Sequence, residues 1–278
     1  MRGLHRWVLR VAAWMTALTA LLLAVCSFPV LAEEEQVYSR HVDIPGIGTA
    51  MYYAQNDPVW GQMRYSRNGD GQPMYMKSAA CGPTAVAMAI AAQLSGGGLS
   101  ALTQSASKPE TGYRFCPCGI NASSHSGNHE VLTLTTDEEF LTYLPTVIAS
   151  FAEGNNNRHH KYSNPGGTSL GLLDGVATAY GMEYRGIRDW DNAVKAMEEG
   201  FSVVTTVRKG PFTTGSHFLY IAGVVDDYVY VLDPLMRTEY SNDKQRVLEI
   251  LEPGVVRAKV KHLARLGFAG YYMVRRAQ

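Results

Sequence analysis

The sequence has no excess of charge of either sign and no internal repeat. Its 278 residues contain 25 lysines and arginines against 25 aspartates and glutamates, so the formal net charge is zero. Proteins that bind nucleic acid through its phosphates usually carry a basic excess, and this composition gives no sign of such a partner. Apolar residues make up 46% of the chain, which is enough for one sizeable core or two small domains.

A long uncharged apolar run occurs at the N-terminus, where Arg2, Arg6 and Arg10 precede residues 11–32. This arrangement is typical of a secretory signal peptide, and the small Ala32 favours cleavage after it. An uncleaved membrane anchor is the alternative, because the run is just long enough to span a bilayer. We therefore expect a secreted or cell-surface protein, associated with a membrane only if the signal is uncleaved. Cleavage removes three arginines and leaves 22 basic against 25 acidic residues.

Cysteine is scarce: the chain has four, and Cys26 lies in the predicted signal. Export leaves Cys81, Cys116 and Cys118, which cannot all pair within one chain. A free thiol outside the cell is prone to oxidation, so its presence suggests a function. A local disulfide between Cys116 and Cys118 would leave Cys81 unpaired.

The same two cysteines are followed by His125 and His129, which together offer four zinc ligands. The first pair is spaced too closely for the common zinc sites, so a disulfide is favoured over a metal. We expect no metal and no other cofactor.

The secondary-structure signals predict an α+β fold. Residues 85–94 are almost entirely apolar and predict a buried helix, and Pro83 places Cys81 at or just before its start. Further along, the pattern predicts a helix over 169–180, a strand over 182–187, a helix over 191–200 and a strand over 201–207. Helices come early and an antiparallel sheet comes late, which is typical of α+β rather than alternating α/β proteins.

We divide the chain into a signal peptide (1–32), a linker or edge segment (33–47) and one domain (48–278). Within the domain, residues 99–165 are rich in Ser, Thr, Asn and His and are interpreted as a variable insertion. One helix is predicted there, over 137–151, with Thr136 at its start.

Cys81 lies where a thiol is activated. The free N–H groups and positive dipole end at a helix start stabilise a thiolate, and the backbone N–H of the cysteine can serve an oxyanion. The alternative is a structural cysteine buried in an alanine-rich helix, which composition alone favours.

A base with an orienting partner would decide between the two. The apolar strands 217–225 and 228–232 flank Asp226-Asp227 and predict a hairpin, with His217 opening it and Asp233 closing it. An ideal two-residue turn would place His217 opposite Met236 and turn Asp233 to the other face. The pairing therefore requires a longer loop or a bulge near Gly223. Alternatively, His217 is a strand-end residue without a role and Asp233 is a turn residue.

Five ordered segments resemble the peptidase C39-like family, cysteine-peptidase-type domains of papain-like fold found mainly in bacteria. They cover roughly residues 48–275 and are Gln55-Asn-Asp-Pro-Val-Trp60, Ala80-Cys-Gly-Pro-Thr-Ala85, Gly166-Gly-Thr-Ser169, Ser216-His-Phe218 and Val231-Leu-Asp-Pro234. The resemblance implies Cys81 as nucleophile, His217 as general base and acid, and Asp233 as the orienting carboxylate. It also implies that Gln55, otherwise a surface loop amide, completes an oxyanion hole.

Two functions follow. The first is a secreted cysteine hydrolase that cleaves a peptide, such as a cell-wall peptide, or a related amide bond through a thioester. The second is a non-catalytic extracellular binding module that retains the papain-like fold, which loss of a triad member would favour; here all four positions are filled. The sequence does not predict the oligomeric state.

Overall fold

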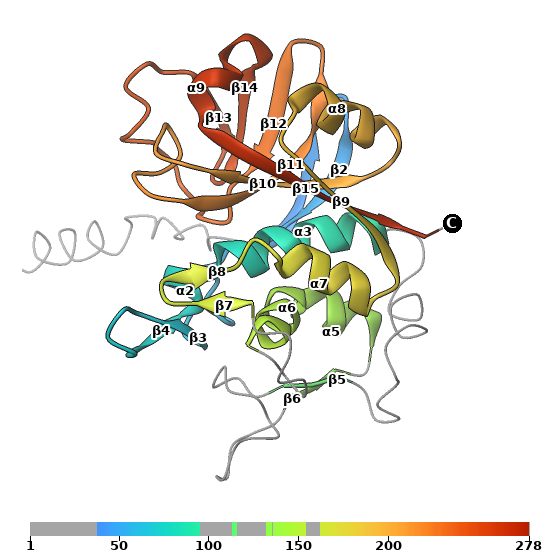
Figure 1. The fold of residues 1–278 in the computed structure, drawn as a ribbon, viewed down its shortest axis with the longest axis vertical. Helices are drawn as coiled ribbons and strands as arrows, with labels where there is room; N and C mark the ends of the chain where they lie inside the picture. Colours follow the sequence, from blue (N-terminus) through green and yellow to red (C-terminus); the bar gives the residue numbers. More distant parts are fainter. Residues whose placement is uncertain (1–37, 95–112, 116–131, 135, 154–161, 278) are drawn as a thin grey trace, which may run out of the picture. The chain divides into compact units, whose positions relative to one another are not determined.

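The structure is a computed structural model that describes residues 38–94, 113–115, 132–134, 136–153 and 162–277. The largest sheet in these ranges has seven strands, and every neighbouring pair in it is antiparallel. From edge to edge its strands are β13 (Leu248–Glu252), β14 (Val255–Lys259), β12 (Tyr228–Leu232), β11 (His217–Val225), β10 (Ser202–Val207), β15 (Phe268–Arg276) and β9 (Met182–Ile187). All seven come from the C-terminal part of the chain, coloured yellow to red in Figure 1.

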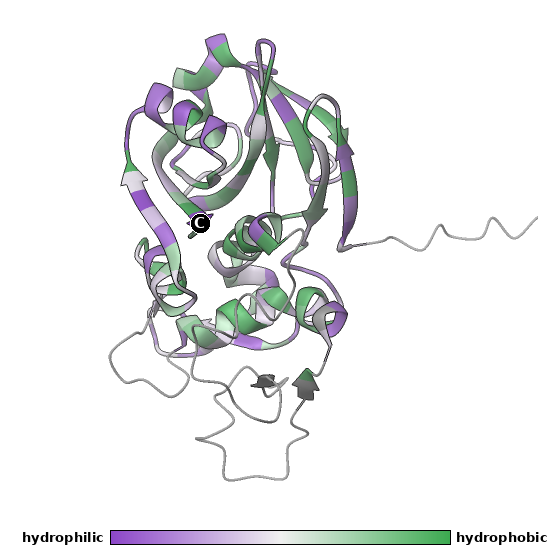
Figure 2. Ribbon diagram, turned by 90° about the vertical axis from the view of Figure 1, so that its right-hand side faces the viewer, coloured by the Kyte–Doolittle hydropathy of each residue, from purple (hydrophilic) through white to green (hydrophobic). Residues whose placement is uncertain are grey.

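Both faces of the large sheet are covered. On one face, α3 (Cys81–Leu94) packs against β10, β11 and β15, with α6 (Leu144–Ala152) and α7 (Leu172–Ala179) beside it. On the opposite face lies α8 (Trp190–Glu198), with loop residues such as Phe212 (Figure 1). The sheet therefore separates two hydrophobic cores, and Figure 2 shows long hydrophobic stretches in its strands and in the helices below it.

Helix α3 is buried on nearly all sides. Only Cys81, Ala92 and Gln93 of its fourteen residues are partly exposed. A helix that is apolar all round packs inside a protein, because it has no polar face to present to water. The predicted buried helix beginning at Cys81 is confirmed, and so is the α+β fold class.

Strands β1 (Arg40–Ile44) and β2 (Gly48–Tyr52) form an antiparallel hairpin. β1 falls in the stretch interpreted as a linker or edge segment. Because Val42 and Ile44 are buried in the core that contains α3, this hairpin is part of the folded unit.

Shorter elements complete the described chain. They are β3 (Arg64–Arg67), β4 (Pro73–Tyr75), α2 (Met76–Ala79), β5 (Tyr113–Phe115), β6 (Leu132–Leu134), α5 (Asp137–Thr142), β7 (Ser163–Asn164), β8 (Gly167–Thr168), η1 (Val260–His262) and α9 (Leu263–Leu266).

Three helices of the structure differ from the predicted ones in where they begin or end. The helix over 137–151 is two helices, α5 and α6, which meet at Tyr143 because Pro145 in the first turn of α6 has no N–H to continue a helical ladder. Thr136 is the N-cap as predicted, and its side chain accepts a hydrogen bond from the Glu139 N–H.

The other two helices begin at other residues than predicted. The helix predicted over 169–180 is α7, which begins at Leu172 with Gly171 as its N-cap. The helix predicted over 191–200 is α8, which begins at Trp190, and Asp189 caps it by accepting the Asn192 N–H at 2.9 Å. In both regions several residues that can cap a helix lie close together, so the pattern alone does not select one. The strand over 182–187 has the predicted bounds, and the predicted hairpin strands match β11 and β12.

No helix within the described ranges combines the length and apolar character needed to cross a membrane. The predicted signal, Cys116, Cys118, His125 and His129 lie outside the described residues.

Candidate active site

Cys81 is the first residue of α3. The opening N–H groups of a helix lack partners within it, so this end presents free donors and a positive dipole. Pro83 fits the first turn because it has no N–H that would need a partner. The next residue must be glycine, because a Cβ on Gly82 would lie 2.5 Å from side-chain atoms of Thr168 in β8. The Thr168 hydroxyl forms a hydrogen bond of 2.8 Å with the Tyr65 hydroxyl.

The Cys81 thiol is the one free cysteine within the described part of the chain. Burial by itself raises the pKa of this thiol. The positive charge of His217, its hydrogen bond to the sulfur and a second hydrogen bond from the backbone N–H of Phe218 outweigh burial and lower the pKa below its ordinary value. The environment of Cys81 thus favours the thiolate.

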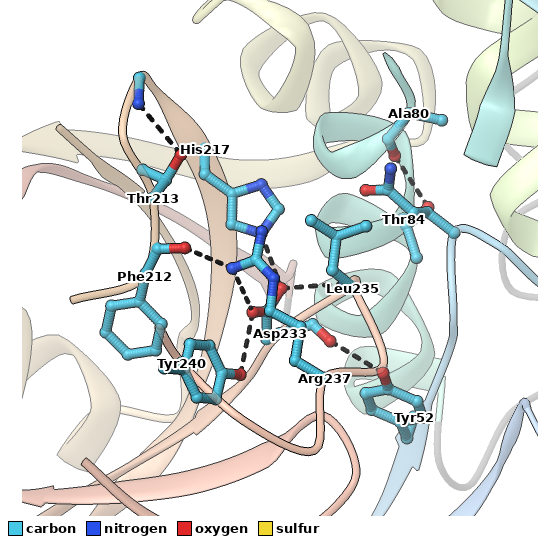
Figure 3. A network of polar contacts seen from close by, with 12 residues as sticks. Tyr52, Ala80, Thr84, Phe212, Thr213, His217, Asp233, Leu235, Arg237 and Tyr240 are labelled. Atoms are coloured by element: carbon cyan, nitrogen blue, oxygen red, sulfur yellow. Dashed lines mark hydrogen bonds and ion pairs between the residues drawn. The ribbon is translucent and has the colours of Figure 1, made fainter. Parts of the chain in front are cut away.

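His217 is the first residue of β11 and is 4% exposed. Its Nε2 lies 2.6 Å from Oδ1 of Asp233 (Figure 3). This contact leaves Nδ1 as the ring nitrogen for the hydrogen bond to Cys81. Burial lowers the pKa of His217, but the negative charges of Asp233 and Cys81, with their hydrogen bonds, raise it to about 10. The imidazolium is therefore the stable form beside a thiolate.

The approach of His217 to Asp233 depends on a β-bulge. β11 and β12 are joined by a two-residue turn, with Val225 paired to Tyr228, and the register shifts between Ile221 and Gly223. The extra residue changes the alternation, so that His217 and Asp233 occupy one face of the hairpin. The bulge expected near Gly223 is confirmed.

Asp233 is 0% exposed and follows β12 directly. Its Oδ1 accepts the Leu235 N–H at 2.9 Å in addition to His217, and its Oδ2 accepts the Tyr240 hydroxyl at 2.9 Å and Arg237 at 3.3 Å. Figure 3 shows this convergence of donors on one carboxylate. A buried carboxylate needs such partners, and four donors fix the orientation in which it holds the imidazole.

Gln55 is 2% exposed and not a surface loop amide. Its backbone N–H donates to the Pro234 carbonyl at 2.8 Å, and its Nε2 donates to the Lys77 carbonyl at 2.9 Å. The residue thereby connects the segment after Asp233 with the segment before Cys81. Its Oε1 has no hydrogen-bond partner among the described residues.

A cavity of about 780 Å³ opens at the thiol. Cys81, His217 and Phe218 line it on one side, and the β7–β8 turn lines it on another. The sequence did not single out Arg188 and Arg208, which also line it, because neither belongs to a motif. It also missed Arg237 and Tyr240, whose nearness to Asp233 in the chain is not a recognisable signal.

The five motif segments resemble one family, and a family model tests this over the whole chain. The model of the Peptidase_C39 like family matches residues 50–250, which is more than half of the chain. The chain belongs to the Peptidase_C39 like family. Membership gives it a papain-like fold and a function of the cysteine-peptidase type, as predicted.

Comparison with solved structures matched this Peptidase_C39 like chain to the crystal structure of the peptidase domain of Streptococcus ComA, a bi-functional ABC transporter involved in a quorum-sensing pathway. The two are 17% identical, the match covers 47% of this chain and 88% of that chain, and the TM-score is 0.30. A comparison with curated proteins gave no match.

Proposed function

We propose that this protein is a cysteine hydrolase that cleaves a peptide or related amide bond, with Cys81 as nucleophile. The observation that carries the proposal is the continuous contact from Asp233 through His217 to Cys81 at the edge of a cavity. Nucleophilic catalysis by a thiol needs these three functions: an ionised sulfur, a proton carrier beside it, and a group that orients the carrier.

In the proposed mechanism, the Cys81 thiolate attacks the carbonyl carbon of the scissile bond. The resulting oxyanion is held by the Cys81 backbone N–H and by Gln55, whose Nε2 has a second hydrogen beyond the one given to Lys77. His217 then gives its proton to the leaving amine, the C–N bond breaks, and a thioester remains. Water attacks the thioester while His217 takes its proton, which releases the acid and restores the thiolate.

We further propose that the protein acts outside the cell or at its surface. Support comes from the charged N-terminus, the apolar run over 11–32 and the small Ala32. The N-terminal residue of the purified protein tests this: a chain that begins near Glu33 supports export, and an intact Met1 contradicts cleavage.

The alternative is a binding module that keeps the fold without turnover. Such a module has no need of an activated thiol, whereas the hydrolase requires an ionised sulfur as its nucleophile. The pKa of the thiol therefore separates the two functions.

The decisive experiment is the rate of Cys81 alkylation by iodoacetamide as a function of pH, with the modified residue mapped by mass spectrometry. We expect selective alkylation with an apparent pKa below the ordinary thiol value of about 8.5, and loss of this activation in His217→Ala. A thiol that is inert, or that titrates ordinarily in both proteins, would favour the binding module. Turnover of mixed fluorogenic peptides, with Cys81→Ala as control, then tests hydrolysis itself.

A further inference from the structure

The cavity beside Cys81 is lined by basic but not acidic side chains. Among the described residues, the charged side chains that line it are those of Arg188 and Arg208, along with His217 from the proposed triad. Neither arginine side chain makes an ion pair or hydrogen bond within the part of the chain that the structure describes. Both side chains are exposed and free to receive a ligand.

The acidic residue next to Arg188 does not neutralise it through a direct contact. Asp189 caps α8, and its Oδ1 accepts the Asn192 N–H at 2.9 Å. The carboxylate is thus directed to the helix start, where the dipole stabilises a negative charge.

In a second cavity of about 400 Å³, basic side chains also outnumber acidic ones. It is lined by Lys209, Lys244 and Arg265, together with one acidic residue, Asp243. Both carboxylate oxygens of Asp243 accept backbone N–H groups, those of Val247 and Leu248. This carboxylate is therefore hydrogen-bonded to nearby backbone.

Residues that are neighbours in the chain line the two cavities. Arg208 lines the first and Lys209 the second, and the Arg208 N–H donates at 2.9 Å to the carbonyl of Gly267, which lines the first. Arg265, two residues before Gly267, lines the second. Five arginines and lysines therefore line the two cavities, in a chain whose net charge is zero. Such a local imbalance attracts anionic ligands.

We propose that the cavity beside Cys81 selects peptides that carry carboxylates, with Arg188 and Arg208 as specificity-determining residues beside the scissile bond. The guanidinium group offers a planar fork of N–H donors that matches a carboxylate, and an unpaired arginine loses no existing partner when it binds one. The proposal rests on the proposed hydrolase function and names its substrate class. The carboxylates belong to acidic side chains or to a free C-terminus, which share this chemistry.

The first test does not require turnover. Cys81 is alkylated in parallel with iodoacetate, an anion, and iodoacetamide, a neutral compound of similar size. In Arg188→Gln and Arg208→Gln the ratio of the iodoacetate to the iodoacetamide rate should fall at least about threefold, because a positive charge that attracts the anion is lost. Arg64→Gln, which removes an exposed arginine that lines neither cavity, is the matched control and should keep the wild-type ratio.

A second test identifies the source of the carboxylate. Two pools of fluorogenic peptides are compared, one with Asp and Glu at the positions where the other has Asn and Gln. Each pool is made with a free and with an amidated C-terminus. We expect a higher kcat/KM on the pools that carry carboxylates, and a reduced preference in both arginine variants. Preference for the acidic pool identifies side chains, and preference for the free C-terminus identifies the terminal group.

The outcomes separate the two proposals. An inert Cys81 overturns the hydrolase function. A reactive Cys81 whose iodoacetate ratio is the same in the wild type, both arginine variants and the control overturns the selection of carboxylates and leaves the hydrolase function standing. Weakening of the wild-type iodoacetate preference in about 1 M salt would confirm that it is electrostatic.

Discussion

His217 and Asp233 are nearly inaccessible to water, and each is stable there only because of its partners. Asp233 receives donors from His217, Leu235, Arg237 and Tyr240, so its charge is distributed over four hydrogen bonds. Its backbone is held as well, since the Tyr52 hydroxyl donates to its carbonyl at 2.8 Å. The imidazole is oriented by a carboxylate that has little freedom to move.

This arrangement predicts two steps in the pH dependence of Cys81 alkylation. The first lies below the ordinary thiol value of about 8.5, because the thiolate forms beside an imidazolium. The second lies near pH 10, where His217 loses its proton and no longer stabilises the thiolate. Below that pH the imidazolium is available to protonate a leaving amine, so kcat/KM should fall through the same second step.

Asp233→Asn tests the cause of the second step. The negative charge of Asp233 raises the pKa of His217, so its removal should move the upper step to lower pH. Stopped-flow alkylation over the full pH range measures this, with circular dichroism to verify the fold. An upper step that stays in place would show that Asp233 does not control the imidazole.

At the scale of the element, the start of α3 is located by a close approach between two segments. Gly82 lies against Thr168 of β8, and the short β7–β8 turn that holds Thr168 also lines the active-site cavity. The position of the nucleophile therefore depends on a contact between residues far apart in the sequence.

Gly82→Ala should destabilise the protein although alanine is the better helix former. The added Cβ meets Cβ, Cγ2 and Oγ1 of Thr168 at 2.5 Å, and a branched side chain cannot rotate its own Cβ away. We expect a loss of about 1–3 kcal/mol in the free energy of unfolding, from urea denaturation, and slower Cys81 alkylation.

The control is a double-mutant cycle with Thr168→Gly, which removes all three contacting atoms. In that background Gly82→Ala should cost clearly less than in the wild type. An equal cost in both backgrounds would contradict steric conflict as the cause.

At the scale of the whole molecule, part of the region interpreted as a variable insertion belongs to the core. Helix α6 lies within residues 99–165 and packs on α3, and its apolar residues from Leu144 to Ala152 join the core that includes the sheet. The nucleophile helix is therefore held between the large sheet on one side and α6 on the other.

Ile148→Ala measures the importance of this support. Ile148 is fully buried on α6, and its truncation should lower the free energy of unfolding by about 2–5 kcal/mol because a cavity remains beside α3. Thr142→Ala, at an exposed position in α5, should change it by no more than about 0.5 kcal/mol. Similar small effects of both substitutions, measured by urea denaturation, would show that α6 is dispensable to the core.

Local features of the fold were predictable from the sequence. The buried helix from Cys81 follows from Pro83 and an unbroken apolar run, and the strands beginning at His217 and Tyr228 follow from β-branched and aromatic residues around Asp226-Asp227. Each of these signals lies within one short segment, where side-chain pattern and backbone preference agree. The same segments contain Cys81 and His217.

Other features were decided only by the tertiary structure. The sequence required a longer loop or a bulge near Gly223 for His217 to reach Asp233, and the pairing of β11 with β12 decided that it is a bulge beside a two-residue turn. The donors Arg237 and Tyr240 and the cavity residues Arg188 and Arg208 lie in loops whose sequences have no periodicity. Contacts between distant residues depend on how the elements pack, and no pattern within a single segment encodes that. The sequence thus determined which groups can perform the chemistry, and the packing decided which of them meet.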